Sequence, residues 1–160
     1  MRQLGIADCQ SPGCRMASDE WQMYLQIVCT RFIKRMSFED LRKRTKLFGL
    51  RIIEMAESLP RTSPSFVITR QLIRSGTSVG ANYRSACRAR SHADFIAKLG
   101  IVEEECDESL YWMEMLVESE LVSPEKVRDL MKEGTEILAV IVSSRKTAKS
   151  RSVAKKKAFP

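Results

Sequence analysis

The sequence predicts an all-α protein, an antiparallel up-and-down four-helix bundle. Apolar residues return every three or four positions along four segments, which is the period of an amphipathic helix. The 160 residues include only 5 prolines and 7 glycines, so long stretches run without a turn signal. The connections between the four segments are short, and short connections make consecutive helices antiparallel neighbours.

The first helix is expected near residues 38–59. Its apolar stripe has steps of three and four, and consists of Phe38, Leu41, Thr45, Phe48, Ile52, Met55 and Leu59. Ser37 is the predicted N-cap, because its side chain can accept a hydrogen bond from a free backbone N–H of the first turn. Pro60 ends the segment, since proline cannot continue a helix.

The second helix is expected near residues 64–89, with Ser63 as its cap and Pro64 at the first helical position. Gly76 and Gly80 fall near its apolar stripe, and each costs roughly 1 kcal/mol of helix propensity relative to alanine. Close packing of another helix would explain them. The alternative is a break near Gly80.

The third helix is expected near residues 91–121 and the fourth near 124–144, after a second serine–proline start at Ser123. Together with the first two they form one predicted domain over 36–144. Residues 145–160 lack apolar periodicity and suggest a frayed helix end or a disordered basic tail.

Residues 1–35 are predicted to lie outside the bundle. They carry one candidate amphipathic helix, from Ser18 to Arg35. Alternatively, native translation starts at Met36, directly before the first bundle helix. No apolar run approaches the ~20 residues of a membrane span, and no secretory signal is evident. The five cysteines are irregularly spaced, so we expect reduced thiols and a cytoplasmic protein.

Charge is unevenly distributed along the chain. Residues 36–92 carry 11 basic and 4 acidic side chains, whereas residues 93–144 carry 4 basic and 13 acidic ones. Residues 145–160 hold seven basic residues and no acid. A basic half is therefore followed by an acidic half and a basic tail.

One stretch of the chain has specific character. Residues 79–116 have the sequence VGANYRSACRARSHADFIAKLGIVEEECDESLYWMEML, preceded by QLIRSGTS at 71–78 and LFGLRIIEMAESLPR at 47–61. Over about residues 36–143 the chain resembles the bacterial four-helix bundle family that includes proteins encoded in intervening sequences of 23S ribosomal RNA genes. The segment spanning the second and third helices is the specific part of this resemblance.

The resemblance implies the same up-and-down bundle, no known enzymatic activity and a tendency toward ring-like homo-oligomers. A pentamer is suggested, because pentamers are known among relatives. Related accessory proteins of diversity-generating retroelements use a basic surface to bind nucleic acid and a reverse transcriptase. The family provides no active-site residues to transfer to this chain.

The residues themselves predict no catalytic site and no cofactor. His92 is the single histidine, and its separation of five positions from Cys87 would place the two on different faces of a helix. A di-iron bundle needs Glu-x-x-His pairs, but the residue three before His92 is Ala89. Glu104 and Glu108 share a helix face without a histidine, so a carboxylate-rich metal site is only a weak alternative.

Two basic sets are candidates for binding nucleic acid by neutralising phosphates. The second helix contributes Arg70, Arg74, Arg84, Arg88 and Arg90, and the tail contributes Arg145, Lys146, Lys149, Arg151, Lys155, Lys156 and Lys157. No aromatic RNA-recognition signature accompanies them, so binding would follow the backbone or the shape of the RNA. Alternatively, the acidic third helix pairs with these arginines, Arg84 and Arg88 above all, within one subunit or between subunits.

Self-association is the other candidate. Tyr111, Trp112 and Met115 lie off the main stripe of the third helix, and aromatic and methionine side chains are favoured in interface cores. A wider buried stripe is the alternative. We therefore expect a non-enzymatic scaffold or binding protein that self-assembles and contacts RNA or a ribonucleoprotein, with a purely protein-binding subunit as the second hypothesis.

Overall fold

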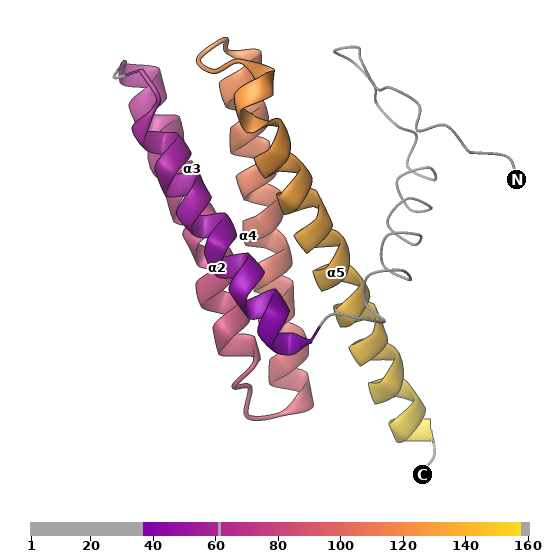
Figure 1. Cartoon of the computed structure of the whole chain (residues 1–160). Helices are drawn as coiled ribbons and strands as arrows, with labels where there is room; N and C mark the ends of the chain where they lie inside the picture. The colour runs from indigo at the N-terminus through magenta and orange to yellow at the C-terminus, as the bar shows by residue number, and fades with distance from the viewer. Residues whose placement is uncertain (1–36, 61, 158–160) are drawn as a thin grey trace, which may run out of the picture.

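The computed structural model describes residues 37–60 and 62–157, and within them the chain is entirely helical apart from short loops. Four helices follow one another, α2 (Phe38–Glu57), α3 (Ser63–Ala86), α4 (His92–Glu118) and α5 (Pro124–Lys157). Each helix packs on the next, and α2 also packs on α5, which closes the bundle (Figure 1). The predicted antiparallel four-helix bundle is confirmed.

The helices begin at residues whose side chains satisfy free backbone groups. Ser37 and Asp40 form a reciprocal capping box, which confirms the predicted first cap. The cap of α3 is Thr62, which accepts from the N–H of Ser65, so the prediction of Ser63 was wrong by one residue. Ser91 caps α4 by accepting from the N–H of Asp94 at 3.1 Å.

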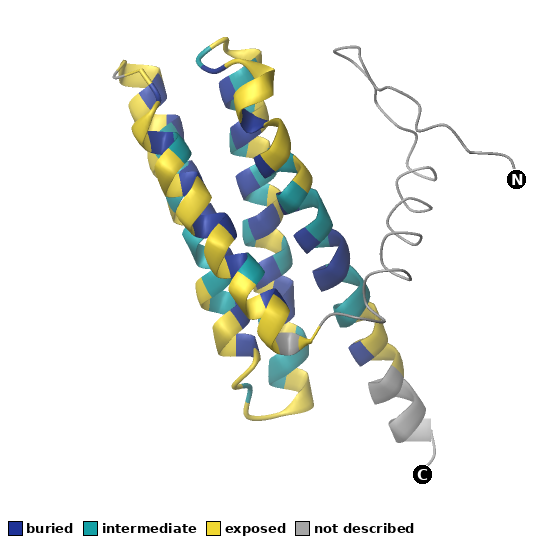
Figure 2. Cartoon of the chain, viewed as in Figure 1, coloured by how far each residue is buried: buried dark blue, intermediate teal, exposed yellow. Residues whose placement is uncertain are grey.

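The predicted apolar stripes form one core. Figure 2 shows buried positions recurring along one side of each helix. The largest fully buried side chains come from all four helices, and include Phe48, Tyr83, Leu99, Met113 and Ile137. Cys106 of the α4 stripe is buried as well, and burial raises the pKa of its thiol to about 12. A thiol with that pKa is inert, so Cys106 is a core residue.

The glycines of α3 mark a close approach of α2, as one of the two hypotheses predicted. A Cβ atom on Gly80 would lie 3.1 Å from the Thr45 carbonyl oxygen, and one on Gly76 would lie 2.2 Å from Ile52 Cδ1. On the α2 side, Gly49 would meet the Gly76 carbonyl at 3.2 Å. Helix α3 continues through Gly80 to Ala86, so the predicted break is absent.

Helix ends differ from the sequence-based boundaries. Helix α3 ends at Ala86 rather than 89, and α4 ends at Glu118 rather than 121. Helix α5 does not fade at Ser144 but continues to Lys157, as one long helix. Its last turns are rich in lysine, arginine and alanine, which are strong helix formers. The first of these turns is also held to α4 by the Arg145–Glu103 ion pair and the contact of His92 with the Ala148 carbonyl.

The remaining predictions concern the two ends of the chain and whether a helix could span a membrane. The proposed N-terminal helix or alternative start at Met36 falls outside the described residues. The side chains of residues 151–157 are also outside them, although the backbone there is helical. Within the described part of the chain, no helix combines the length and apolar character needed to cross a membrane.

Candidate functional site

Three arginines join neighbouring helices through ion pairs, and we call them the seam arginines. Arg44 of α2 makes the most extensive set, because it donates to both carboxylate oxygens of Glu133, each at 2.8 Å, and to Glu136 at 2.9 Å. Its side chain is only 19% exposed. Donation to Glu133, the largest cause, and to Glu136 raises the pKa of Arg44. This seam joins α2 to α5.

Arg74 joins α3 to α4. It forms an ion pair with Glu108 and lies 3.6 Å from the nearer carboxylate oxygen of Glu105. Glu108 also accepts from the indole N–H of Trp112 at 3.0 Å, and the Trp112 and Arg74 hydrogen bonds lower the pKa of the Glu108 carboxyl. The charge of Arg74 is therefore paired within the chain, although the sequence placed this residue among the nucleic-acid-binding candidates.

Arg145 joins α5 to α4. Its guanidinium donates to Glu103 at 2.8 Å and passes over Gly100, where a Cβ atom would lie 3.1 Å from Arg145 Nη2. Glycine at position 100 thus makes room for the arginine. Arg145, like Arg74, was predicted to bind nucleic acid, but its guanidinium forms an ion pair within the chain.

Arg84, Arg88 and Arg90 are exposed, and none of them forms an ion pair with another described residue. The hypothesis that α4 pairs with Arg84 and Arg88 within one subunit is wrong. The antiparallel arrangement places Arg88 beside the start of α4, where Asp94 is the nearest acid in sequence. Asp94 is already held by Lys98 at 2.6 Å and by the Arg90 backbone N–H at 2.9 Å.

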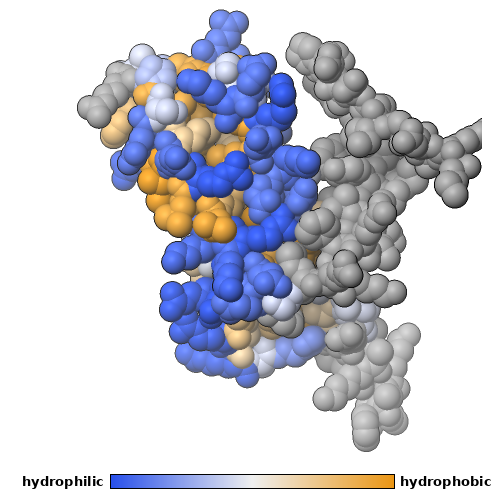
Figure 3. Space-filling model, in the orientation of Figure 1, coloured by the Kyte–Doolittle hydropathy of each residue, from blue (hydrophilic) through white to orange (hydrophobic). Residues whose placement is uncertain are grey.

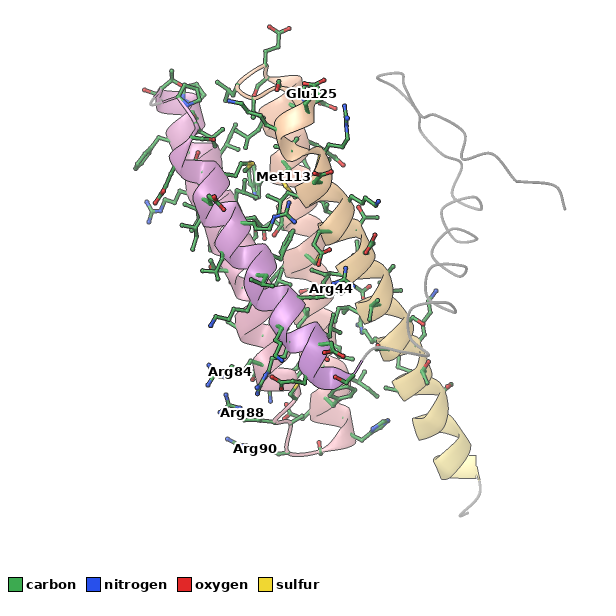
Figure 4. The ribbon with its side chains drawn as sticks, viewed as in Figure 1. Arg44, Arg84, Arg88, Arg90, Met113 and Glu125 are labelled. Carbon is green, nitrogen blue, oxygen red and sulfur yellow. The ribbon has the colours of Figure 1, made fainter. Side chains whose placement is uncertain are left out.

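The structure brings the second basic set to this same end of the bundle. His92, two residues after Arg90, contacts the Ala148 carbonyl of α5 through Nε2 at 2.8 Å. Exposed Lys146 and Lys149 of α5 therefore lie at the end where α3 turns into α4. Figure 4 shows Arg84, Arg88 and Arg90 pointing away from the bundle there, whereas Arg44 lies against α5.

We call this region the basic end. Its described members are exposed lysines and arginines without an ion pair among the described residues, namely Arg84, Arg88, Arg90, Lys146 and Lys149. The backbone of Arg151, Lys155, Lys156 and Lys157 continues from it along α5. Arg70 is exposed but lies roughly 21 Å along α3 from Arg84, so it is not part of the basic end.

A groove of about 540 Å³ between α2 and α3 adjoins the basic end. Its charged half is lined by Arg42, Lys43, Lys46 and Arg84 and by Glu39, which pairs with Arg42, so Lys43, Lys46 and Arg84 give this half its positive charge. Its apolar half includes Leu50, Ile53 and Ala81. The sequence-based predictions did not include this groove, because Leu50 and Ile53 lie off the main stripe of α2. A second apolar spacing, Leu47–Leu50–Ile53, was the signal that could have indicated it.

The proposed interface residues of α4 have different surroundings. Tyr111 is 50% exposed, whereas Trp112 and Met115 are partly buried and pack against the core. The Tyr111 and Trp112 rings meet edge to face with centroids 5.0 Å apart. The Tyr111 ring is therefore exposed. Trp112 and Met115 instead belong to a wider buried stripe of α4, as the alternative prediction had it.

The prediction that helical spacing separates Cys87 from His92 was wrong. Cys87 and His92 do line one shallow cavity, because α3 ends at Ala86 and helical spacing no longer separates them. The described residues lining that cavity include no carboxylate, and His92 Nε2 is bound to Ala148. No group of three or more histidine, cysteine or acidic side chains in the described ranges could hold a metal ion.

Comparison with known proteins agrees with this fold. A protein of unknown function from the S23 ribosomal protein family of Bacteroides thetaiotaomicron, known from its crystal structure, superposes with a TM-score of 0.65. The two sequences are 36% identical over 69% of this chain and 99% of the other. No curated protein matches. The family model of the 23S rRNA-intervening sequence protein matches residues 39–143. The chain therefore belongs to the 23S rRNA-intervening sequence protein family.

Proposed function

We propose that this chain is a non-enzymatic, cytoplasmic binding protein that contacts RNA, alone or within a ribonucleoprotein, through its basic end, and that its copies self-associate. One observation carries the RNA contact. Arg84, Arg88 and Arg90 lie at the same end of the bundle as Lys146 and Lys149, although more than fifty positions separate the two sets in sequence. None of the five forms an ion pair with a described residue, so all are available to a polyanion.

The chemistry of the basic end suits phosphates better than base edges. Lysine and arginine neutralise backbone phosphates and release counterions, which gives affinity without sequence information. Exposed His92 is the ring that lies beside these cations, and its Nε2 is bound to the Ala148 carbonyl, so we expect readout mainly of RNA shape and backbone. The seam arginines Arg44, Arg74 and Arg145 contribute little, because their charges are already compensated.

Self-association rests on a separate observation. Leu47, Leu50 and Ile53 of α2 are exposed side by side, at 56%, 50% and 36%. Contiguous exposed apolar residues on a folded domain mark interaction surfaces. A scaffold that presents several basic ends would bind a long RNA more tightly than one copy does, through effective concentration.

The RNA contact is tested by binding a structured RNA to the full chain over a series of salt concentrations. The variant carries Arg84→Gln, Arg88→Gln and Arg90→Gln. Its matched control carries Arg51→Gln, Arg70→Gln and Arg128→Gln, which removes the same charge from three exposed arginines elsewhere. We expect the first variant to lose roughly 10- to 100-fold in affinity, and the salt slope to fall by about 2.

Equal losses in both triple variants would mean that net charge alone acts and that the basic end has no special role. A wild-type chain that binds no RNA at low salt would overturn the RNA proposal and favour the purely protein-binding hypothesis. Light scattering with and without nuclease checks self-association independently, because a mass above one chain must persist after RNA is digested.

A further inference from the structure

The groove between α2 and α3 is apolar at one half and cationic at the other, and this combination restricts what can fill it. Figure 3 shows apolar residues gathered on this side of the bundle, bordered by hydrophilic ones. The exposed apolar residues of α2 are Leu47, Leu50 and Ile53, and Lys43 and Lys46 follow toward its N-terminus. A fitting partner offers acidic groups and apolar side chains on one elongated face.

The outward face of α4 has this composition. Exposed Ile101, Glu104, Asp107, Tyr111 and Glu114 recur along it every three or four residues, and so lie on one face of the helix. Ile101 is 42% and Tyr111 50% exposed, so the acids alternate with apolar surface. Glu118 continues the face at its C-terminal end.

The acids of this face are not compensated by the chain's own cations. Glu104, Asp107, Glu114 and Glu118 form no ion pair with any side chain that the structure describes, whereas Glu103, Glu105 and Glu108 of the same helix meet the seam arginines. Burial, with Glu118 and Asp107 nearby, raises the pKa of Glu114. Cations brought to this face would relieve that repulsion.

We infer that the α2/α3 groove of one copy receives the outward face of α4 from a second copy, with Lys43 and Lys46 against the α4 acids and Leu47, Leu50 and Ile53 against Ile101 and Tyr111. This assignment rests on the proposed self-association and names its two surfaces. The surfaces are different parts of the chain, so the contact is heterologous. Each copy therefore uses its groove for one neighbour and its α4 face for another, and the assembly closes as a ring or extends as a filament.

RNA is the competing occupant of the groove. Its apolar half consists of aliphatic side chains, threonines and glycines, and the described lining residues include no aromatic ring on which a base could stack. Desolvating Leu50 and Ile53 requires an apolar partner, which the α4 face supplies and a phosphate backbone does not. We therefore place the second copy in the groove and the RNA at the basic end.

A charge-reversal mixing experiment tests the assignment. One variant carries Lys43→Glu and Lys46→Glu, and the other carries Glu104→Lys and Asp107→Lys. All four positions are exposed, so both chains should fold, as circular dichroism can verify. Each variant alone opposes like charges across the contact, and its self-association should weaken roughly 100-fold or more, as measured by light scattering.

Mixing the two variants should restore assembly. The reversed groove of one chain then meets the reversed α4 face of the other, and the two unaltered surfaces also complement each other. Native mass spectrometry should find assemblies that contain both variants. An interface that pairs groove with groove would leave the self-association of the α4 variant unchanged, and one that pairs α4 with α4 would leave that of the groove variant unchanged, so weakening of both single variants is the result that the heterologous contact requires.

An apolar substitution provides a second measurement with a matched control. Leu50→Glu places a charge in the groove, whereas Phe66→Glu places the same charge at a 70%-exposed apolar position outside the groove lining. We expect Leu50→Glu to reduce the assembly to single chains and Phe66→Glu to leave its mass unchanged.

The outcomes separate the two proposals. A nuclease-treated wild-type chain that is monomeric overturns self-association itself. A multimeric wild type whose mass survives both Leu50→Glu and Lys43→Glu with Lys46→Glu overturns the choice of surfaces while self-association stands. Loss of RNA binding in the Lys43/Lys46 variant, with its mass unchanged, would assign the groove to RNA.

Discussion

The seam arginines and the arginines of the basic end are the same residue type with opposite surroundings. Arg44, Arg74 and Arg145 each reach a glutamate on another helix. Arg84 and Arg88 follow Arg74 along the same sequence stretch, yet form no ion pair within the described residues. The difference depends on where the helices end and not on local composition.

This contrast separates stability from binding. Charge that is compensated across a seam fixes the pairing of two helices but attracts little from outside. Charge left at the end of the bundle contributes nothing to packing and gives that end a positive field that attracts polyanions. The two groups of arginines should therefore respond oppositely to substitution, one in folding and the other in binding.

The largest effect on folding is expected for Arg44→Met. Methionine keeps much of the arginine stem but leaves Glu133 and Glu136 without their cation at a partly buried seam. Breaking such a pair should lower the free energy of unfolding by about 2 kcal/mol, and the melting temperature of a chain of this size by about 5 °C. Urea unfolding measures the first quantity and calorimetry the second.

Arg88→Met is the matched control for that substitution. It removes the same charge from an exposed position without an ion pair, so the free energy of unfolding should change by less than about 0.5 kcal/mol. If Arg88→Met destabilised the chain as much as Arg44→Met, the distinction between seam and end would be lost.

A smaller effect is expected for Arg145→Ala, about 1 kcal/mol, because this side chain is 28% exposed and pairs with one glutamate. Its consequence should be local. Amide hydrogen exchange should accelerate in α5 beyond Ala148, where the anchoring of the last turns to α4 is weakened. Lys149→Ala, one turn further on, should leave exchange unchanged. Uniform acceleration along all four helices would show that Arg145 stabilises the whole bundle instead.

The fold was predictable because its main determinant is periodic. Four apolar stripes and their capping signals specify four helices, and short loops specify their antiparallel order. Even the close approach at Gly76 and Gly80 could be foreseen, because two glycines inside a helical stripe need a physical reason. The boundaries of the helices were predicted less accurately. The end of α5 was missed because its last turns have no apolar period, although their lysines and alanines favour helix.

The candidate site was only partly predictable. Sequence spacing identified the basic residues, but could not distinguish Arg74, which meets Glu108, from Arg84, roughly 15 Å further along α3. That distinction depends on which turn of α4 lies opposite, and therefore on the loop between the helices. The contact of His92 with Ala148, which joins the two basic sets, involves a backbone carbonyl and leaves no sequence signature.

Arg74 offers an intermediate case between the two groups, since it is paired but 51% exposed. Substituting Arg74→Gln should destabilise the chain less than Arg44→Met does, because water screens the pair. The difference from wild type in the free energy of unfolding should shrink further in 1 M salt, where the Debye length is about 3 Å.

A double-mutant cycle tests the Arg74 pair itself. The effects of Glu108→Gln and Arg74→Gln on the free energy of unfolding should not be additive, whereas those of Glu104→Gln, on the outward face, and Arg74→Gln should be. Coupling to Glu104 would contradict the assigned seam.

The smallest effect concerns Asp94, the acid nearest in sequence to Arg88 and Arg90. The hydrogen bond from the Lys98 side chain, first, and that from the Arg90 backbone N–H hold the pKa of its carboxyl below its usual range. A depressed folded pKa adds stability that is present above about pH 4 and is lost as the pH falls through the folded value. The difference in the free energy of unfolding between wild type and Asp94→Asn should therefore be constant from pH 7 to about pH 5 and shrink below about pH 4.

Arg88→Met is the control for this prediction. Because Lys98 is the partner of Asp94, Arg88→Met should leave the pH dependence of the free energy of unfolding unaltered. A smaller acid-side loss in Arg88→Met would mean that Asp94 compensates Arg88 after all, and the basic end would be less available to RNA than its exposure suggests.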